Sequence, residues 1–503
     1  MTTAKKSLIL LLICGFAFLY FALNKIDDFD YQVDEPLWVH LSKIQENHGI
    51  ILDTEFAPPL PFWINGLALK ITKNNLAPRY MSILIFIATL IITYRLLDNL
   101  QITRTKKMLF MSALLINPYF ILYSRTAMTD IHYFSFMWLS ILSLYIYLEK
   151  KEKKYITLSG IFFSLSALTK HISLVFYPLF IIAMMTLQKK RKLTKKDILT
   201  FLAYSSIGFI FLGAVDIAGF LKTGETYSFL SRLIKIVNIL PFIEIASNKA
   251  QGTLITEPAM LVGRAIKYTT AILLYTFPFI PLLIKFKINK NKKTAETLLT
   301  PDQKHILAII LGMLSISIFL TEGYMRQLIV IYPLTYLFVI KNTKINALKA
   351  FSIFAVWCLI INIYAFSLFD TKIFGSSRDY LEDVADTKLQ MFEYINSNTD
   401  KNDIVITNIY PDIMNAKESI LTSISTKSPP ENAKYIMYDP EAIKDKKEKQ
   451  EIENNLKYHD LEKTFEYKNI TEHYIYKVNK TRWDSKEKRR PISPVLMFND
   501  IIK

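Results

Sequence analysis

The stretch KKSLILLLICGFAFLYFAL, residues 5–23, opens the chain with two lysines and a long apolar run. A helix that crosses a hydrocarbon core of ~30 Å needs about 20 such residues at 1.5 Å each. No small-residue cleavage pattern follows the run, so we interpret it as a retained first transmembrane helix rather than a signal peptide. Because 51% of the 503 residues are hydrophobic and gather in blocks of this kind, the sequence predicts an α-helical polytopic membrane protein.

Further apolar blocks bring the expected number of transmembrane helices to about eleven. They cover residues 78–97, 107–124, 131–148, 155–168, 172–187, 201–221, 264–284, 305–320, 327–340 and 350–369. The blocks at 155–168 and 327–340 are short for a full crossing, so the number of spans is less well defined than the class.

The connections between these blocks alternate between basic and non-basic. With about eleven spans, the basic connections all fall on the same side as Lys5 and Lys6, which the positive-inside rule places in the cytoplasm. These connections are 104–107, 150–154, 189–196, 285–293 and 341–349. The non-cytoplasmic side then receives residues 25–58, 125–130, 170–171, 222–263, 322–326 and the C-terminal tail. We therefore expect a cytoplasmic N-terminus and an extracytoplasmic tail, in the plasma or inner membrane if the cell is prokaryotic.

The net charge of +17 does not indicate nucleic-acid binding. From residue 370 onward 22 Lys and Arg face 24 Asp and Glu, so the tail carries −2 and the membrane part +19. The excess lies in short loops, as positive-inside retention predicts. Cys14 and Cys358 lie in apolar blocks, so neither a disulfide framework nor a zinc site is expected.

Two short helices are expected in the first outer loop, residues 25–75. Pro36 suits the first turn of a helix, and Leu37, Leu41 and Ile44 follow at helical spacing, which predicts an amphipathic helix at the membrane interface. A second apolar segment, 59–71, would be only ~20 Å long as a helix and too short to span. We expect both to form a shelf on the outer face of a membrane domain, residues 1–369.

The tail, residues 370–503, has a different pattern. Strand-like runs alternate with polar, helix-like stretches such as 380–395, which predicts a small soluble α/β domain. The runs are 404–407, 435–438, 464–467 and 473–478. The Lys- and Glu-rich stretch 444–453 is typical of a solvated helix face.

Ionisable residues next to membrane spans are costly and mark candidate functional sites. Each group in this chain also has a simple structural interpretation: helix capping, a surface turn, a snorkelling lysine or a salt bridge at the rim. Four connections on the outer side carry them: Asp34-Glu35, the turn Arg125 to Asp130, Lys170-His171, and Glu322 with Arg326. Their convergence on one side favours a site.

The order of these motifs resembles the GT-C glycosyltransferases. The motifs are an Asp-Glu pair after the first span, the segment APPLPFW (57–63), an Arg-x-x-Met-x-Asp turn, a Leu-Thr-Lys turn and a late Arg before Tyr332-Pro333. They are most similar to the branch that contains the protein O-mannosyltransferases and the lipid A aminoarabinose transferases. The resemblance covers most of residues 7–369.

This resemblance implies an integral membrane glycosyltransferase, a hexosyl- or pentosyltransferase, that acts on the non-cytoplasmic face. It would transfer a sugar from a polyprenyl or dolichyl phosphate to a lipid, glycan or protein acceptor, with membrane lipid as its surroundings. By this analogy Asp34 is the general base, with Glu35 beside it and Asp130 as the second acid. The residues expected to bind the lipid phosphate or sugar are Arg125, Lys170, His171, Arg326 and Glu55.

The chain also departs from the pattern of these enzymes. A charged residue commonly precedes the Pro-Pro pair, where this chain has Phe56-Ala57, and an Arg that often follows the Asp-Glu pair is missing. These departures leave open the assignment of the phosphate contacts and whether a divalent metal ion is a cofactor.

Two other classes of function are alternatives. A membrane transporter or lipid flippase would place its charges near the bilayer midplane and break its spans in both halves, whereas this sequence has no obvious repeat and places its acids at the rim. A non-catalytic membrane scaffold would tolerate replacement of Asp34 and Asp130.

Overall fold

A computed structural model of the chain describes the helical bundle and most elements of the tail. The described residues are 2–24, 26, 35–48, 50–54, 58–74, 76–189, 193–223, 329–342, 347–363, 385–400, 403–407, 420–423, 433–438, 446–467, 470–478 and 495–497. The spans expected at 264–284 and 305–320 lie outside these residues.

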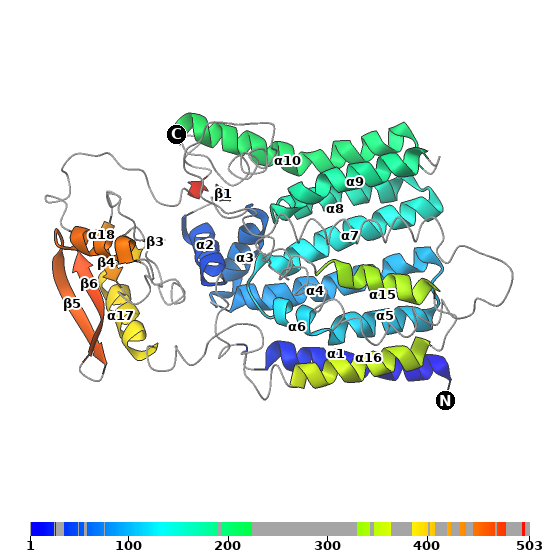
Figure 1. Cartoon of the computed structure of the whole chain (residues 1–503), viewed down its shortest axis with the longest axis horizontal. Coiled ribbons are helices and arrows are strands. Elements are labelled where there is room, and N and C mark those ends of the chain that lie inside the picture. The colour runs from blue at the N-terminus through cyan, green and yellow to red at the C-terminus, as the bar shows by residue number, and fades with distance from the viewer. Residues whose placement is uncertain are drawn as a thin grey trace.

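The described helices of the membrane part form one bundle of long, roughly parallel or antiparallel rods (Figure 1). Five are long and apolar enough to cross a membrane, and the bent pair α5 and α6 passes the same test of length and composition when its two helices are taken together. The five are α1 (Thr3–Leu23), α4 (Ala77–Leu96), α7 (Thr129–Lys150), α9 (Ile172–Lys189) and α10 (Lys195–Thr223). The shorter α8 (Lys153–Ala167), α15 (Ile331–Asn342) and α16 (Ala347–Ile363) pack among them. Each of the nine expected spans that overlap the described residues has a helix.

Helix α7 is the centre of the bundle, since nearly every residue along it is buried. Its Trp138 donates from Nε1 to Thr93 Oγ1 of α4 over 2.9 Å. The rings of Phe120 and Phe134 lie 4.6 Å apart, next to Phe86 of α4. Aromatic packing and a few hydrogen bonds between helices hold this core, as expected for a bundle that lies in lipid.

Helices α8 and α10 are in close backbone contact. A Cβ added at Gly160 would lie 2.9 Å from the carbonyl oxygen of Phe201, and one at Gly208 would lie 2.6 Å from that of Ser164. Gly160 lies against Phe201, and Ser164, one turn later in α8, lies against Gly208, which is later in α10. Since the contacting positions increase in both helices, the two helices run parallel. Small residues that let backbones approach are typical of membrane helix pairs.

The bend of 61° between α5 (Arg104–Ile116) and α6 (Pro118–Ser124) has a clear cause in the sequence. Asn117 caps α6 by accepting from the backbone N–H of Tyr119 over 2.9 Å, and Pro118 has no N–H to continue α5. Two later helices complete the bend: Tyr336 of α15 accepts from Asn117 Nδ2 over 2.7 Å, and Asn362 of α16 donates to the carbonyl of Ile116 over 2.8 Å.

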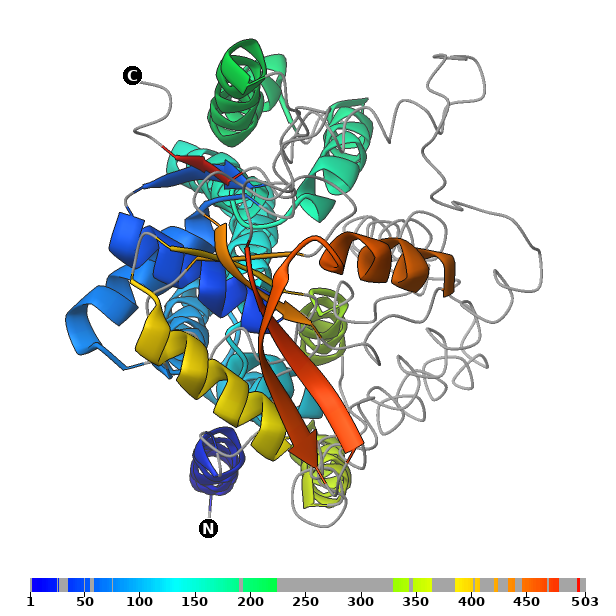
Figure 2. The same cartoon turned by 90° about the vertical axis from the view of Figure 1, so that its left-hand side faces the viewer.

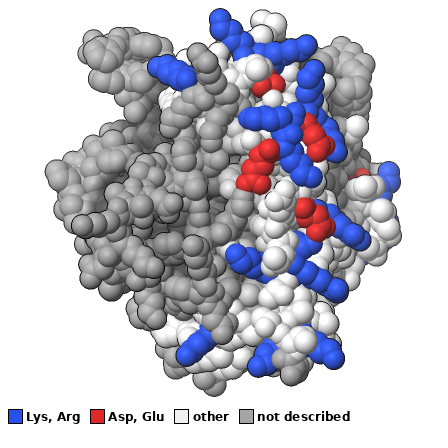
Figure 3. Space-filling model, turned by 90° about the vertical axis from the view of Figure 1, so that its right-hand side faces the viewer, with Lys and Arg blue, Asp and Glu red and all other residues white. Residues whose placement is uncertain are grey.

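The two ends of the bundle differ in charge. Figure 3 shows lysine and arginine spread over the end where the chain begins. The exposed cations there include Lys5, Lys6, Arg104, Lys150, Lys151, Lys153, Lys154, Lys195 and Lys196. The basic connections that the sequence groups on one side therefore meet at one end, as far as the structure describes them.

The other end carries α2 (Glu35–His48), β1 (Ile51–Thr54) and α3 (Leu60–Thr72). The two helices match the expected short helices, and their place at the membrane interface stays a prediction. The two helices pack closely: a Cβ added at Gly66 of α3 would lie 2.5 Å from Gln45 Cγ of α2. Strand β1 was not expected, and it pairs antiparallel with β7 (Val495–Met497) from the end of the chain (Figure 2).

The tail contains a five-stranded sheet in the order β3-β2-β4-β6-β5. Strands β2 (Ile404–Thr407), β3 (Ile420–Ser423) and β4 (Ala433–Tyr438) are parallel, whereas β5 (Asp460–Tyr467) and β6 (Ile470–Lys477) form an antiparallel pair. Helix α17 (Ala385–Asn398) packs on one face through Met391 and Ile395, and α18 (Lys446–Leu456) on the other through Ile452 and Leu456. This is the α/β arrangement that the alternating pattern predicts. The boundary at residue 370 lies outside the described residues.

Candidate active site

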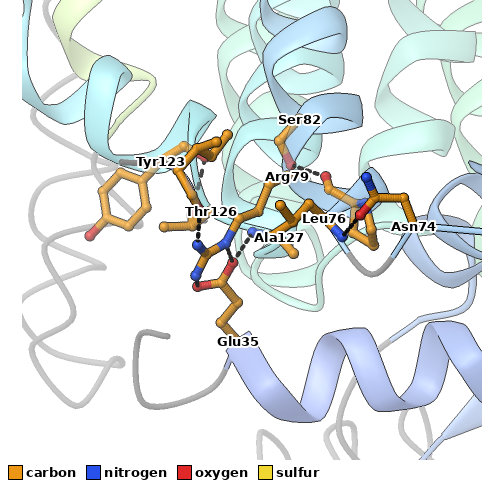
Figure 4. A network of polar contacts seen from close by, with 10 residues as sticks. Glu35, Asn74, Leu76, Arg79, Ser82, Tyr123, Thr126 and Ala127 are labelled. Atoms are coloured by element: carbon orange, nitrogen blue, oxygen red, sulfur yellow. Dashed lines mark hydrogen bonds and ion pairs between the residues drawn. The ribbon is translucent and has the colours of Figure 1, made fainter. Parts of the chain in front are cut away.

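Glu35, the first residue of α2, is fully buried and is bound from two separate parts of the chain. Its Oε1 accepts from Arg79 Nε over 2.8 Å and from the backbone N–H of Ala127 over 2.6 Å, and its Oε2 accepts from Arg79 Nη2 over 3.1 Å (Figure 4). Arg79, in the first turn of α4, also donates to the carbonyl of Ile26. A two-point contact between a carboxylate and a guanidinium fixes the orientation as well as the distance. Glu35 therefore joins α2 to α4 and to the turn before α7.

Arg125, in that same turn, donates to the end of the first helix. Its Nη1 lies 3.0 Å from the carbonyl oxygen of Phe21 and its Nη2 2.8 Å from that of Asn24. These carbonyls lie at the C-terminal end of α1, which is the negative end of the helix. Burial, and then the nearby Arg79, lower the pKa of Arg125 to about 10, while Glu35 opposes the shift. The guanidinium therefore stays charged at neutral pH.

Asp130 in the first turn of α7 forms an ion pair with Lys170, which lies between α8 and α9. The Asp130 side chain is fully buried, and 17% of the Lys170 side chain remains exposed. The corresponding exposure is 1% for Arg79 and 3% for Arg125. Of these three cations, Lys170 is therefore the one that reaches an open surface.

The Pro-Pro segment lies against the lysine turn. The backbone N–H of Leu60, at the start of α3, donates to the carbonyl of Leu168 over 3.1 Å, and Pro58 and Pro59 are buried. Since Leu168 is two residues before Lys170, the APPLPFW segment and the Leu-Thr-Lys turn are neighbours.

Three of the four ionisable connections thus meet at one end of the bundle. His171 follows Lys170 and is partly exposed. Asp34, Glu55 and Arg326 lie outside the described residues, although Asp34 directly precedes Glu35 and Glu55 directly follows β1. Among the side chains that the structure describes, no three His, Cys, Asp or Glu residues gather as cation ligands.

Arg79 is the residue that the sequence interpretation missed. It stands at the outer end of the expected span 78–97, and an ionisable residue inside an apolar block is a signal in itself. The other candidates lie in the connections between spans, whereas Arg79 lies inside one.

Comparisons with known proteins bear on the family and the fold. The sequence profile of the family described as dolichyl-phosphate-mannose-protein mannosyltransferase matches residues 57–215. The fold matches ArnT from Cupriavidus metallidurans in the apo state with a TM-score of 0.59 and 7% sequence identity, over 96% of this chain and 100% of that one. The structure of the same enzyme bound to undecaprenyl phosphate matches with a TM-score of 0.58 and 8% identity, over 95% and 98% of the two chains. No curated protein sequence matches the chain.

The fold is therefore that of the GT-C membrane glycosyltransferases, a polytopic bundle of helices. The matched profile is that of a mannosyltransferase family, so together with the fold it supports membrane glycosyltransferase activity, as the order of the motifs predicts. The transporter and flippase alternative is not favoured.

Proposed function

We propose that the chain transfers a sugar from a polyprenyl-phosphate donor to a hydroxyl or phosphate of a lipid, glycan or protein acceptor, at the end of the bundle that carries α2 and α3. The observation that carries the proposal is the meeting of the Asp-Glu helix start, the 125–130 turn and the Lys170 turn at that end. The binding of undecaprenyl phosphate by ArnT, which has the same fold, supports a donor of this class.

The reaction needs a base, a reacting sugar carbon and a stabilised leaving group. Asp34 accepts the proton of an acceptor hydroxyl, whose oxygen attacks the anomeric carbon of the sugar. The bond from that carbon to the phosphate oxygen breaks with inversion, and the lipid phosphate leaves with the electron pair. A cation is needed to stabilise the departing phosphate.

Lys170 suits the role of that cation because it is partly exposed while its partner Asp130 is buried. Asp130 then orients the ammonium group. Arg125 and Arg79 act less directly, since they hold α1 and Glu35 in place. His171, Glu55 and Arg326 are proposed as further donor or acceptor contacts.

The proposed orientation places this end on the non-cytoplasmic side, because the opposite end carries the basic loops. A polyprenyl donor would then reach the site from the bilayer, past the shelf formed by α2 and α3.

The test is sugar transfer in purified membranes supplied with labelled polyprenyl-phosphate sugars. Wild type is compared with Asp34→Asn and Lys170→Met at matched expression. We expect Asp34→Asn to lower the transfer rate about 100-fold or more, the usual scale of general-base catalysis. We expect Lys170→Met to lower it by a similar factor, because the departing lipid phosphate loses the cation that stabilises it.

Lys107→Met is the matched control. Lys107 also pairs with an aspartate, Asp98, near the opposite, basic end, where the Lys107 side chain is 6% exposed and that of Asp98 is 55% exposed. Transfer that survives in Asp34→Asn and Lys170→Met as it does in Lys107→Met would refute the assigned site.

A further inference from the structure

Strand β7, residues 495–497, pairs with the strand in the loop that leads into the site. Strand β7 pairs with β1 in the register Ile51↔Met497, Asp53↔Leu496 and Thr54↔Val495. Some 440 residues separate the partners in sequence. In Figure 2 the two strands lie side by side, next to α2.

Strand β1 is held on its other sides by the shelf and by α10. The backbone N–H of Ile51 donates to Gln45 Oε1 of α2 over 2.6 Å, and its carbonyl accepts from Trp63 Nε1 of α3 over 2.5 Å. Leu52 packs against Val215 and Phe211 of α10. Within the described residues, β7 is the only strand that pairs with β1.

The position of β1 matters because the strand leads directly into the Pro-Pro segment. After Thr54 only three residues precede Pro58, and Leu60 is bonded to the turn that carries Lys170. A shift of β1 would therefore also move the Pro-Pro segment and, through it, the proposed donor site. A strand without a partner leaves its backbone groups unpaired, and two strands alone are marginally stable.

We propose that β7 is a positioning element for the transfer reaction, which holds β1 and the Pro58–Leu60 segment in the geometry that the proposed glycosyl transfer needs. The proposal rests on the function proposed above. It assigns a role at the membrane-bound site to the end of the chain, separate from the five-stranded sheet of the tail.

The first test asks whether the strands pair as described. In the full-length double variant Thr54→Cys with Val495→Cys, a disulfide is expected, because paired residues on antiparallel strands have Cα atoms about 4.5 to 5.5 Å apart, within disulfide range. The off-register variant Thr54→Cys with Met497→Cys is the control. Cross-linking in the control and not in the paired variant would overturn the register.

The second test asks whether the pairing affects transfer. The double variant Val495→Pro with Leu496→Pro removes two successive backbone N–H groups of β7. Successive residues of an antiparallel strand alternate between hydrogen-bonded and non-hydrogen-bonded pairs, so one of the two lost N–H groups is a donor to β1. We expect kcat to fall about ten- to a hundred-fold through misplacement of the site, with the donor KM and the thermal unfolding midpoint close to wild type. The variant Val495→Ala with Leu496→Ala keeps the backbone and should transfer sugar normally.

Wild-type kcat in the proline variant would overturn the positioning role, and so would a fall in the unfolding midpoint that matches the loss of activity. The cross-linked cysteine variant should keep its activity, because the disulfide holds the paired state. If wild type transfers no sugar from any donor, the proposed function fails, and the cross-linking test still decides the pairing.

Discussion

Glu35 and Arg79 illustrate how a charged pair near a membrane is stabilised. Both side chains are essentially buried, and Ala127 adds a backbone hydrogen bond to the carboxylate. Removing one partner of such a pair leaves the other charge buried without its counter-ion, which costs ~3–5 kcal/mol. Removing both charged side chains costs less stability, because neither charge is then left buried alone.

We therefore expect Glu35→Gln and Arg79→Met each to lower the thermal unfolding midpoint in detergent strongly. The double variant should be less destabilised than the sum of the two singles, as coupled neighbours are. Lys73→Met is the control, because Lys73 pairs with Glu46 at the surface with its side chain 72% exposed. If the single variants were as mild as this control, the buried pair would not be holding α2.

At this scale the sequence predicts which residues gather but not how they pair. Asp130 and Lys170 were expected on one side of the membrane, and they do form an ion pair. The expected contact of Arg125 with the lipid phosphate stays a prediction, and its guanidinium donates to the carbonyls of Phe21 and Asn24 at the end of α1. Whether an arginine contacts a ligand or the end of a helix depends on the distance in space between residues about 100 positions apart. The sequence does not give that distance.

At the scale of elements, the parallel contact of α8 and α10 forms one wall of the bundle. Each glycine in it faces a backbone atom rather than only the end of a flexible side chain. A methyl group there has to separate the helices, since backbone cannot move aside as a side chain can.

Gly160→Ala and Gly208→Ala are therefore expected to destabilise the protein by ~1–3 kcal/mol, the usual cost of overpacking. Gly15→Ala in α1 is the control, because a Cβ there meets nothing within 4 Å. It should be neutral or stabilising by up to ~1 kcal/mol through helix propensity. Thermal unfolding in detergent measures the stability of all three variants. An equal change of the unfolding midpoint in the three would contradict the close contact of α8 and α10.

The helices could be predicted from apolar blocks, and four strands of the tail from short alternating runs. Strands β1, β3 and β7 were not predicted. β1 and β7 have four and three residues, and among the described strands each pairs with the other alone, from opposite ends of the sequence. A strand this short gives too little alternation to be recognised, and its partner is set by the fold.

At the scale of the whole molecule, the basic end and the site end define a direction across the membrane. Lys195 is exposed at the basic end, and Tyr458 is 53% exposed beyond α18 in the tail. The native Cys14 and Cys358 are buried.

In right-side-out vesicles, a membrane-impermeant maleimide should label Tyr458→Cys directly. Lys195→Cys should react only after permeabilisation, because basic loops are retained in the cytoplasm. Wild type, with its two buried thiols, gives the background. The reverse labelling pattern would place the proposed site in the cytoplasm and exclude the proposed orientation.

The bend between α5 and α6 has a consequence for biosynthesis. The groups that complete it, Tyr336 and Asn362, follow their partners by 219 and 246 residues. During translation, Asn117 and the carbonyl of Ile116 enter the membrane long before these partners exist. The 125–130 turn directly follows the bend, so the segment that leads into this turn gains its two hydrogen bonds to α15 and α16 only after those helices have been made. A ribosome-bound intermediate that has inserted α1 to α10 therefore has most of the charged residues of the site and lacks these two hydrogen bonds at the bend.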